Sequence, residues 1–190
     1  MLSHDEACFS LLPTLRPTLG VTGHRPLVGN LACHDVLYVF GALNEVTGRL
    51  TTAIVERPRT ATTRSPQRYL QAAFARHLRD IARAYPAAQS LRVVVVLDKA
   101  SWHRGAWVPA GLKAFPPLEL SPLPSYSPQL QVIERFWKVL RRRATHNRLF
   151  PTMAQLKRTV RNNLCYYQTL KHRVLSVIQS SRKRTKSSAA

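Results

Sequence analysis

A run of β-branched residues at positions 91–97, Leu91-Arg92-Val93-Val94-Val95-Val96-Leu97, constrains the fold of this chain more than any other feature. Such a short and apolar run is typical of a strand that is buried on both faces of a sheet. Asp98 follows it directly, so the pattern predicts a carboxylate at the end of a buried strand. That carboxylate indicates either a turn that ends the strand or a functional site at the edge of the sheet.

A second acidic residue, Glu134, lies in a segment whose apolar residues recur at helical spacing. We expect a helix that begins at Ser127-Pro128, a capping residue followed by proline at the first helical position. Glu134 is then either a ligand at the border of the buried face or a solvated residue paired with Lys138 four positions later. The expected apolar stripe is Leu130, Ile133, Trp137 and Leu140.

The rest of the chain predicts an α/β domain with a mixed sheet, in which an antiparallel meander precedes parallel strands and helices cover both faces. Strand-like runs at 7–12, 36–43 and 49–56 form the meander, and a further strand is expected at 118–121. Helices are expected from Ser65-Pro66 to Pro86, at 105–115, and from Thr152, which has capping-box spacing to Gln155. Their expected apolar faces are Leu70, Phe74, Leu78, Ile81 and Tyr85 in the first, and Met153, Leu156, Val160, Leu164 and Tyr167 in the last.

The charge of the chain points to a polyanionic partner. There are 29 Lys and Arg residues against 9 Asp and Glu, a formal net charge of +20, and nucleic acid would neutralise that charge. The alternative is a generally arginine-rich composition without a binding role. We expect one domain over residues 1–175 and a basic, disordered tail over 176–190, which would add unspecific, salt-sensitive DNA affinity.

The sequence also predicts a soluble, intracellular protein. Cys8, Cys33 and Cys165 are widely separated, so neither a disulfide framework nor a paired metal-ligand spacing is expected. No apolar run reaches the length of a membrane span, and the N-terminal residues do not have the pattern of a signal peptide.

Carboxylates at a strand end and on a neighbouring helix suit metal-dependent phosphodiester chemistry. Two Mg²⁺ ions roughly 3.5 to 4 Å apart activate an oxygen nucleophile and stabilise the leaving oxygen, and Mg²⁺ prefers oxygen ligands. Such a site usually needs a third carboxylate. Asp5 is favoured because the first strand could pair beside the strand that ends at Asp98, and Glu6 is an alternative ligand. The acidic residues considered upstream are Asp5, Glu6, Asp35, Glu45 and Glu56.

Two segments carry a family resemblance: residues 97–103, Leu97-Asp98-Lys99-Ala100-Ser101-Trp102-His103, and residues 123–137, which include Ser127-Pro128 and Ile133-Glu134-Arg135-Phe136-Trp137. They resemble the catalytic core of mariner-related bacterial insertion-sequence transposases, which are DDE superfamily endonucleases with a ribonuclease H-like fold. The resemblance extends upstream to Asp5-Glu6-Ala7, Gly23-His24-Arg25-Pro26 and Phe40-Gly41-Ala42-Leu43, and covers roughly residues 1 to 170.

The resemblance implies an enzyme that cleaves DNA strands and transfers them in transposition. Asp5, Asp98 and Glu134 would bind two Mg²⁺ ions, with Mn²⁺ as a substitute. It further implies DNA partners (element ends and target), a homodimer on DNA, a separate N-terminal helix-turn-helix polypeptide, no membrane association, and a location at the nucleoid in the bacterial cytoplasm. Lys99 stands where the family usually has Asn. Two alternatives follow: a catalytically inactive DNA-binding remnant, and a ribonuclease H-like nuclease without a role in transposition.

Several residues are candidates for DNA contact. His103 would approach the scissile phosphate or serve as a hydrogen-bonded structural histidine. Trp102 and Trp137 are expected in the core rather than against DNA. The basic residues on the last expected helices would grip phosphates or form a solvated face. These residues are Lys138, Arg141, Arg142, Arg143, Lys157 and Arg161.

Overall fold

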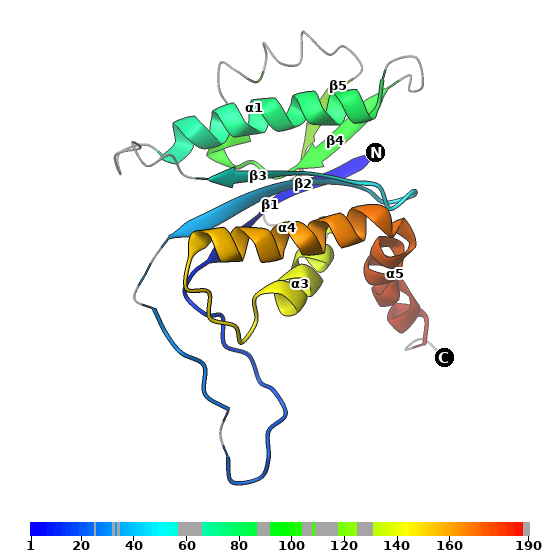
Figure 1. Ribbon diagram of the computed structural model, residues 1–190. Coiled ribbons are helices and arrows are strands. Elements are labelled where there is room, and N and C mark those ends of the chain that lie inside the picture. The colour runs from blue at the N-terminus through cyan, green and yellow to red at the C-terminus, as the bar shows by residue number, and fades with distance from the viewer. Residues whose placement is uncertain are drawn as a thin grey trace.

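The computed structural model describes residues 1–24, 26–31, 33, 35–56, 66–86, 92–103, 108, 118–124 and 131–187. Its centre is a five-stranded sheet with strand order β3-β2-β1-β4-β5 (Figure 1). The first three strands form an antiparallel meander, and β4 and β5 run parallel to β1. The predicted mixed sheet is therefore confirmed. The strands are β1 (Leu2–Ser10), β2 (Val36–Asn44), β3 (Leu50–Glu56), β4 (Val93–Leu97) and β5 (Leu118–Pro122).

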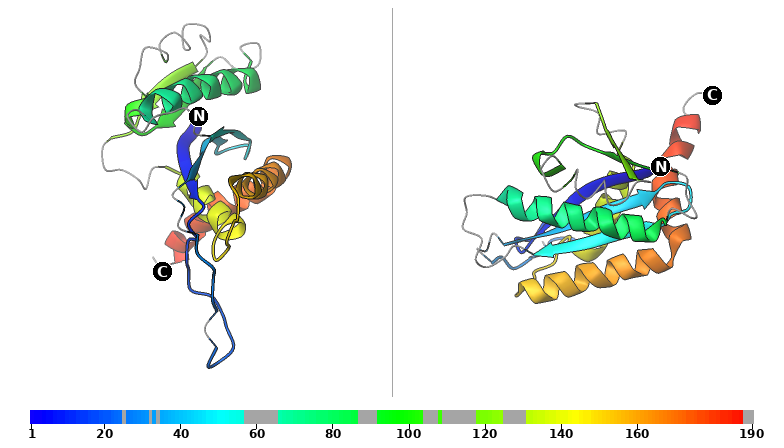
Figure 2. Two further views of the ribbon diagram at one scale, coloured as in Figure 1. Left: turned by 60° about the vertical axis from the view of Figure 1, so that its left-hand side comes forward. Right: turned by 90° about the horizontal axis from the view of Figure 1, so that it is seen from above.

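Helices cover both faces of the sheet (Figures 1 and 2). Helix α1 (Pro66–Ala84) lies on one face, while α3 (Ile133–Ala144), α4 (Met153–Thr169) and α5 (Lys171–Ser187) lie on the other. Alternate residues of a strand point to opposite faces, and in β2 Val39 joins the core under α3 and α4 while Phe40 joins the core under α1. The sheet thus separates two hydrophobic cores. A short 3₁₀ helix, η1 (Ser101–His103), follows β4.

Two strand predictions need correction. β1 begins at Leu2 rather than near Ala7, because Leu2 and the histidine at position 4 are buried in the sheet, so Asp5 lies in the middle of the strand. β4 is not fully buried on both faces. Val93, Val95 and Leu97 are buried on the α1 side, whereas the side chains between them are only half-buried.

Two of the predicted helices are confirmed: the one from Ser65-Pro66 is α1, and the one from Thr152 is α4. The predicted faces of α1 and α4 are largely confirmed, although Tyr85 lies just beyond the end of α1 and Met153 is only partly buried. Thr152 caps α4, since its hydroxyl accepts a hydrogen bond from the Gln155 backbone N–H at 3.3 Å. The predicted helix at 105–115 lies outside the described residues except for Val108.

Helix α3 begins at Ile133, so the predicted start at Ser127-Pro128 is wrong. Those two residues lie outside the described part of the chain, but Val132 is the N-cap residue and precedes the helix. A tertiary contact sets the start: the Ile133 N–H donates to the Ser3 hydroxyl of β1 at 3.4 Å.

The C-terminal segment differs from the predicted disordered tail. Helix α5 continues to Ser187, and Val174 and Ile178 are buried in the core under α3 and α4. The Arg135 guanidinium donates to the Ile178 carbonyl at 2.9 Å and ties α5 to α3. Leu175 and Val177 pack partly buried against the same core, so the apolar residues of the first half of α5 anchor the helix.

Two other expectations concern the whole chain. Cys8, Cys33 and Cys165 all belong to the described residues and are free thiols, as predicted. Within the described ranges, no helix combines the length and the apolar character needed to span a membrane.

Candidate metal-binding active site

The register of β1 against β4 brings Asp5 and Asp98 together. Leu2 pairs with Val95 and Ser3 with Val96 in the parallel ladder. Continuing that register along both strands puts Asp5 beside Asp98. Carboxylate oxygens of Asp5, Glu6 and Asp98 lie within 4.8 Å of one another, close enough to share a metal ion.

Helix α3 brings Glu134 toward the same region. Asp5 pairs with Gly41 across the β1–β2 ladder. A Cβ atom at Gly41 would lie only 2.6 Å from Trp137 Cζ2 and 3.0 Å from Ile133 Cδ1, so the absence of a side chain lets α3 pack closely over the sheet. Glu134 lies in the first turn of that helix, and its charge acts on Asp5.

The Asp5 carboxyl group lies in surroundings that oppose its ionisation. Burial is the largest cause, followed by the neighbouring charge of Glu6, with smaller contributions from Asp98 and Glu134, and together they raise the pKa of Asp5 to about 7. A divalent cation would remove this repulsion. The chemistry of the donor set therefore suits a hard cation such as Mg²⁺ or Mn²⁺.

Asp98, in contrast, is held in its charged form. His103 Nδ1 lies 3.0 Å from Asp98 Oδ1, and the Ala100 N–H donates to the same oxygen at 3.0 Å. The hydrogen bond from His103 is the main cause that lowers the pKa of Asp98, and it outweighs the opposing effect of burial. Lys99, the residue after Asp98, is exposed.

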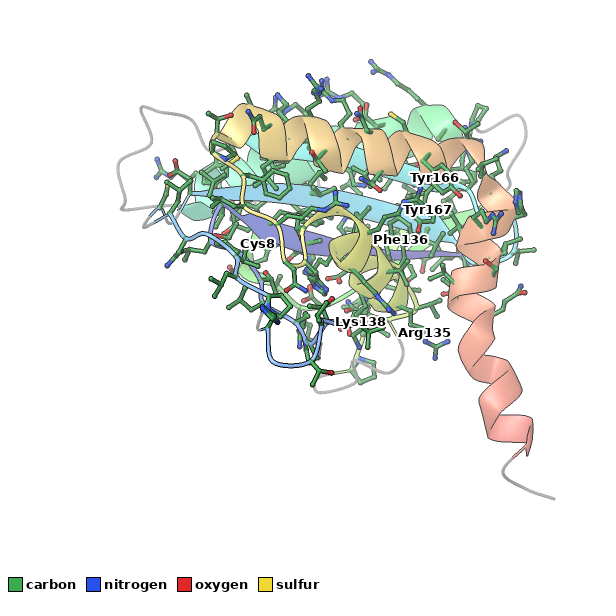
Figure 3. All side chains as sticks on the ribbon, turned by 60° about the horizontal axis from the view of Figure 1, so that its bottom comes forward. Cys8, Arg135, Phe136, Lys138, Tyr166 and Tyr167 are labelled. Atoms are coloured by element: carbon green, nitrogen blue, oxygen red, sulfur yellow. The ribbon has the colours of Figure 1, made fainter. Side chains whose placement is uncertain are left out.

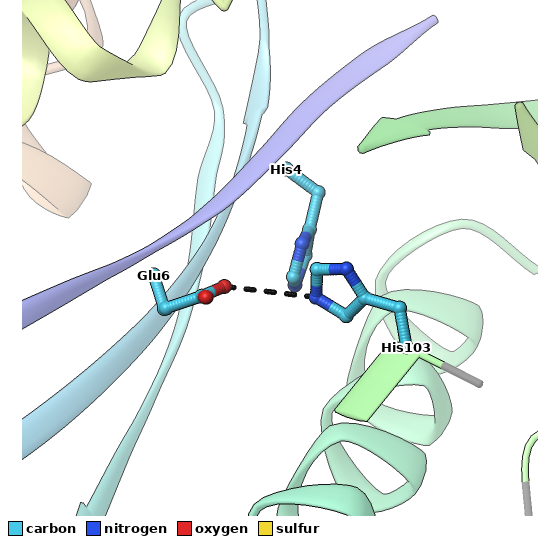
Figure 4. A group of neighbouring side chains, drawn as sticks. All are labelled: His4, Glu6 and His103. Atoms are coloured by element: carbon cyan, nitrogen blue, oxygen red, sulfur yellow. Dashed lines mark ion pairs between the residues drawn. The ribbon is translucent and has the colours of Figure 1, made fainter. Parts of the chain in front are cut away.

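His103 lies inside the protein, between two carboxylates. Its Nε2 atom is 3.6 Å from Glu6 Oε2 (Figure 4). Its Nδ1 atom is 3.2 Å from the Asp98 carbonyl oxygen. Burial alone would lower the pKa of His103, but the neighbouring carboxylates of Asp98 and Glu6 raise it to about 9. With 6% of its surface exposed, His103 has the environment of a structural histidine rather than of a surface DNA contact.

His4, which was not predicted from the sequence, is fully buried in the same region, with its ring centroid 5.4 Å from that of His103. The available signal was alternation along the first strand, where His4 and Glu6 are two residues apart and face the same side. Because the first strand was expected to begin near Ala7, position 4 was not considered part of it.

The basic candidates on α3 do not share one face. Lys138 and Arg141 follow Glu134 by four and seven residues and lie on its side of the helix. The Arg141 guanidinium lies 5.9 Å from the ring centroid of Phe9, whereas that of Arg143 lies 4.1 Å from the ring centroid of Tyr166 in α4. In Figure 3, Phe136, Tyr166 and Tyr167 lie between α4 and α3, and Lys138 lies on α3.

The remaining candidates lie elsewhere. Arg142 is exposed on α3, and Lys157 and Arg161 lie on α4, which packs against α3 and β3 at the sheet edge opposite β4 and β5. Trp137 is buried and Trp102 packs partly buried against the core under α1, as the core interpretation predicted.

Similarity searches agree with this architecture. The DDE superfamily endonuclease family matches residues 1–157. The structure is similar to the mariner Mos1 paired-end complex with Mg, with 16% identity and a TM-score of 0.61; the match covers 94% of this chain and 53% of that one. It is similar to the Mos1 paired-end complex with the left transposon end, with 14% identity, a TM-score of 0.60 and the same two coverages. It is also similar to the catalytic domain of Mos1 mariner transposase, with 15% identity and a TM-score of 0.56; this match covers 94% of this chain and 78% of that one. No curated protein matches the chain.

The five-stranded mixed sheet with helices on both faces is thus a ribonuclease H-like fold, as found in the Mos1 catalytic domain. Within that class, the chain belongs to the DDE superfamily endonuclease family. It spans about half the length of the Mos1 chains in the DNA complexes that it matches.

Proposed function

We propose that this chain is the catalytic domain of a transposase, which cleaves DNA strands at element ends and joins them to a target. The observation that carries the proposal is the convergence of acidic residues from β1, the end of β4 and the first turn of α3, in surroundings that raise the pKa of Asp5 to about 7. Membership of the DDE superfamily endonuclease family supports the same conclusion.

Asp5, Asp98 and Glu134 would hold two Mg²⁺ ions, with Mn²⁺ as a substitute. Bound ions of this kind activate water or a 3′ hydroxyl group and stabilise the leaving oxygen. Mos1 structures with Mg and with Mn support the choice of cation.

The protein groups have distinct roles in this proposal. His103 and the Ala100 N–H keep Asp98 ionised and oriented as a ligand. Asp5 must lose its proton when a cation binds, because its pKa lies near neutrality. Lys138, Arg141 and Arg142 would hold the phosphate backbone beside the carboxylates, and Lys157 and Arg161 would bind phosphates farther from them. Arg143 is stacked on Tyr166 and would not contact DNA.

The partners follow from the same proposal. Mos1 structures include a complex with the left transposon end and a strand transfer complex, so element ends and target DNA are the proposed substrates. A second copy of the chain on DNA, a helix-turn-helix polypeptide that recognises the ends, and a location at the bacterial nucleoid complete the proposal.

The test is cleavage of supercoiled DNA by the purified chain in roughly millimolar Mg²⁺ or Mn²⁺. We expect metal-dependent nicking by the wild type and its loss in Asp98→Asn. Asp80→Asn is the matched control, since Asp80 is exposed on α1 and pairs with Arg83 at 3.7 Å. It should nick like the wild type.

A wild type that binds DNA without nicking it in either metal would overturn the enzymatic proposal. That outcome would favour a catalytically inactive DNA-binding remnant, the alternative to which Lys99 points. Nicking without preference for any end sequence would instead favour a ribonuclease H-like nuclease outside transposition.

A further inference from the structure

A group of buried polar side chains lies on the α1 side of the sheet, away from the face that carries Asp5. His4 and His77 are fully buried and His103 nearly so, and the His4 ring centroid is 5.4 Å from each of the other two. Among the described residues, neither ring nitrogen of His4 has a hydrogen-bond partner, and His103 Nε2 and Glu6 Oε2 also have none. Buried polar atoms without partners are uncommon and point to an unfilled interaction.

Three of these side chains have the geometry of a ligand set. His4, Glu6 and His103 each offer one ligand atom, and these atoms lie within 4.8 Å of one another (Figure 4). His103 Nε2 and Glu6 Oε2 are 3.6 Å apart, which is long for a hydrogen bond. Two ligands about 2.0 to 2.1 Å from a tetrahedral ion would be roughly 3.4 Å apart, so the observed separation fits a shared ion.

Asp98 orients His103 in the manner found around metal-bound histidines. Its carboxylate and carbonyl oxygens both lie near Nδ1, so Nε2 is the nitrogen that faces His4 and Glu6. A carboxylate that holds the second ring nitrogen commonly fixes the orientation of a ligating imidazole and makes it a better ligand.

We propose that His4, Glu6 and His103 form a second metal site, distinct from the site of Asp5, Asp98 and Glu134, which takes a borderline divalent cation such as Zn²⁺. Two imidazole nitrogens with one carboxylate suit Zn²⁺ and disfavour Mg²⁺, which prefers oxygen ligands throughout. The ion would tie β1, which carries His4 and Glu6, to η1, which carries His103. This proposal assigns Glu6 to the second site and does not depend on the proposed DNA chemistry.

The test is a titration of the metal-stripped, full-length chain with Co²⁺ and then Zn²⁺, in excess Mg²⁺ to occupy the carboxylate site. We expect stoichiometric Co²⁺ binding with the absorption of a nitrogen-containing, low-coordinate site, and displacement of Co²⁺ by Zn²⁺. His4→Gln and His103→Gln should each weaken binding by at least roughly tenfold. His77→Gln is the matched control, because His77 is equally buried beside His4 but lies outside the ligand set. It should retain wild-type affinity.

X-ray absorption of the Zn²⁺-loaded wild type provides a second measurement that does not depend on the folding of any variant. Scattering from two imidazole rings is expected. Oxygen ligands alone, or equal Co²⁺ affinity in folded His4→Gln and in the wild type, would overturn the second site. Neither measurement involves DNA, so failure here is distinguishable from failure of the nicking assay.

Discussion

At the scale of single residues, the candidate active site depends on a contrast between two carboxyl groups. Burial, and then the neighbouring negative charges, raise the pKa of Asp5 to about 7, while a hydrogen bond from His103 lowers the pKa of Asp98. One ligand is therefore ionised before a cation arrives, and the other is ionised fully only with the cation. Without metal, Asp5 is a source of instability that the fold tolerates.

The prediction is that Asp5→Asn stabilises the metal-free chain in a pH-dependent way. Because the folded pKa of Asp5 is raised above 3.8, the folded chain binds the proton more tightly than the unfolded chain, so the wild type loses stability as pH rises from about 4 to about 7. Asp5→Asn has no such loss and should exceed the wild type by roughly 2 to 4 kcal/mol above pH 7. Urea unfolding in a chelator at several pH values measures this difference.

Metal provides the control for that experiment. Millimolar Mn²⁺ or Mg²⁺ should stabilise the wild type more than Asp5→Asn, because the ions bind the folded site and the variant lacks one ligand. A difference between the two proteins that stays constant with pH would contradict the raised pKa of Asp5.

Asp98 and Glu134, two of the proposed acidic ligands, could be singled out from the sequence for reasons that are local. Asp98 follows an apolar run, and Glu134 borders a helical apolar stripe, so each is conspicuous in its own segment. His4 was not predicted because its significance depends on His103, about a hundred residues later, and on the packing of both rings against Phe74 of α1. Such a cluster is a property of tertiary structure.

At the scale of elements, the position of Glu134 depends on how closely α3 approaches the sheet. Gly41 permits that approach, since Trp137 occupies the space of the missing side chain directly opposite Asp5 on the neighbouring strand. The same contact explains why the start of α3 was mispredicted. Ser127-Pro128 is a sound local start signal, but the contact of Ile133 with Ser3 and the packing of Trp137 on Gly41 determine where the helix lies.

Gly41→Ala should therefore displace α3. The added methyl group would meet Trp137 at 2.6 Å, and overpacking of this kind typically costs about 1–3 kcal/mol of stability. Nicking activity should fall as well, because Glu134 moves with the helix. Chemical denaturation and the supercoiled-DNA assay measure the two effects.

Trp137→Phe tests the cause of that effect in a double-mutant cycle. The smaller ring leaves room for the methyl group that Gly41→Ala adds, so Gly41→Ala should cost less in the Trp137→Phe background than in the wild type. An equal cost in both backgrounds would show that Trp137 is not the residue that Gly41 accommodates.

At the scale of the whole molecule, the effect of the net charge on DNA binding differs from the effect of where the fold places each basic residue. A net charge of +20 predicts DNA affinity wherever the basic residues lie, and the sequence alone could not show which of the basic candidates adjoin the carboxylates. The fold distributes them unequally. Lys138 lies one helical turn from Glu134 and is exposed, whereas Arg143, on the other side of α3, is stacked on Tyr166. A run of neighbouring basic residues in the sequence is thus divided between two surfaces, and only one of them adjoins the carboxylates.

Lys138→Gln and Arg143→Gln separate these two contributions, because each removes one positive charge from the same helix. Each phosphate contact that is lost lowers the salt dependence of DNA binding by about one unit in the slope of log K against log salt. We expect that change in slope for Lys138→Gln, measured by fluorescence anisotropy over a salt series. For Arg143→Gln we expect an unchanged slope, because this substitution removes a packing contact between α3 and α4 rather than a phosphate contact. If net charge alone governed binding, the two variants would behave alike. A larger slope change for Arg143→Gln would put the DNA on the α4 side of the molecule, away from Asp5, Asp98 and Glu134.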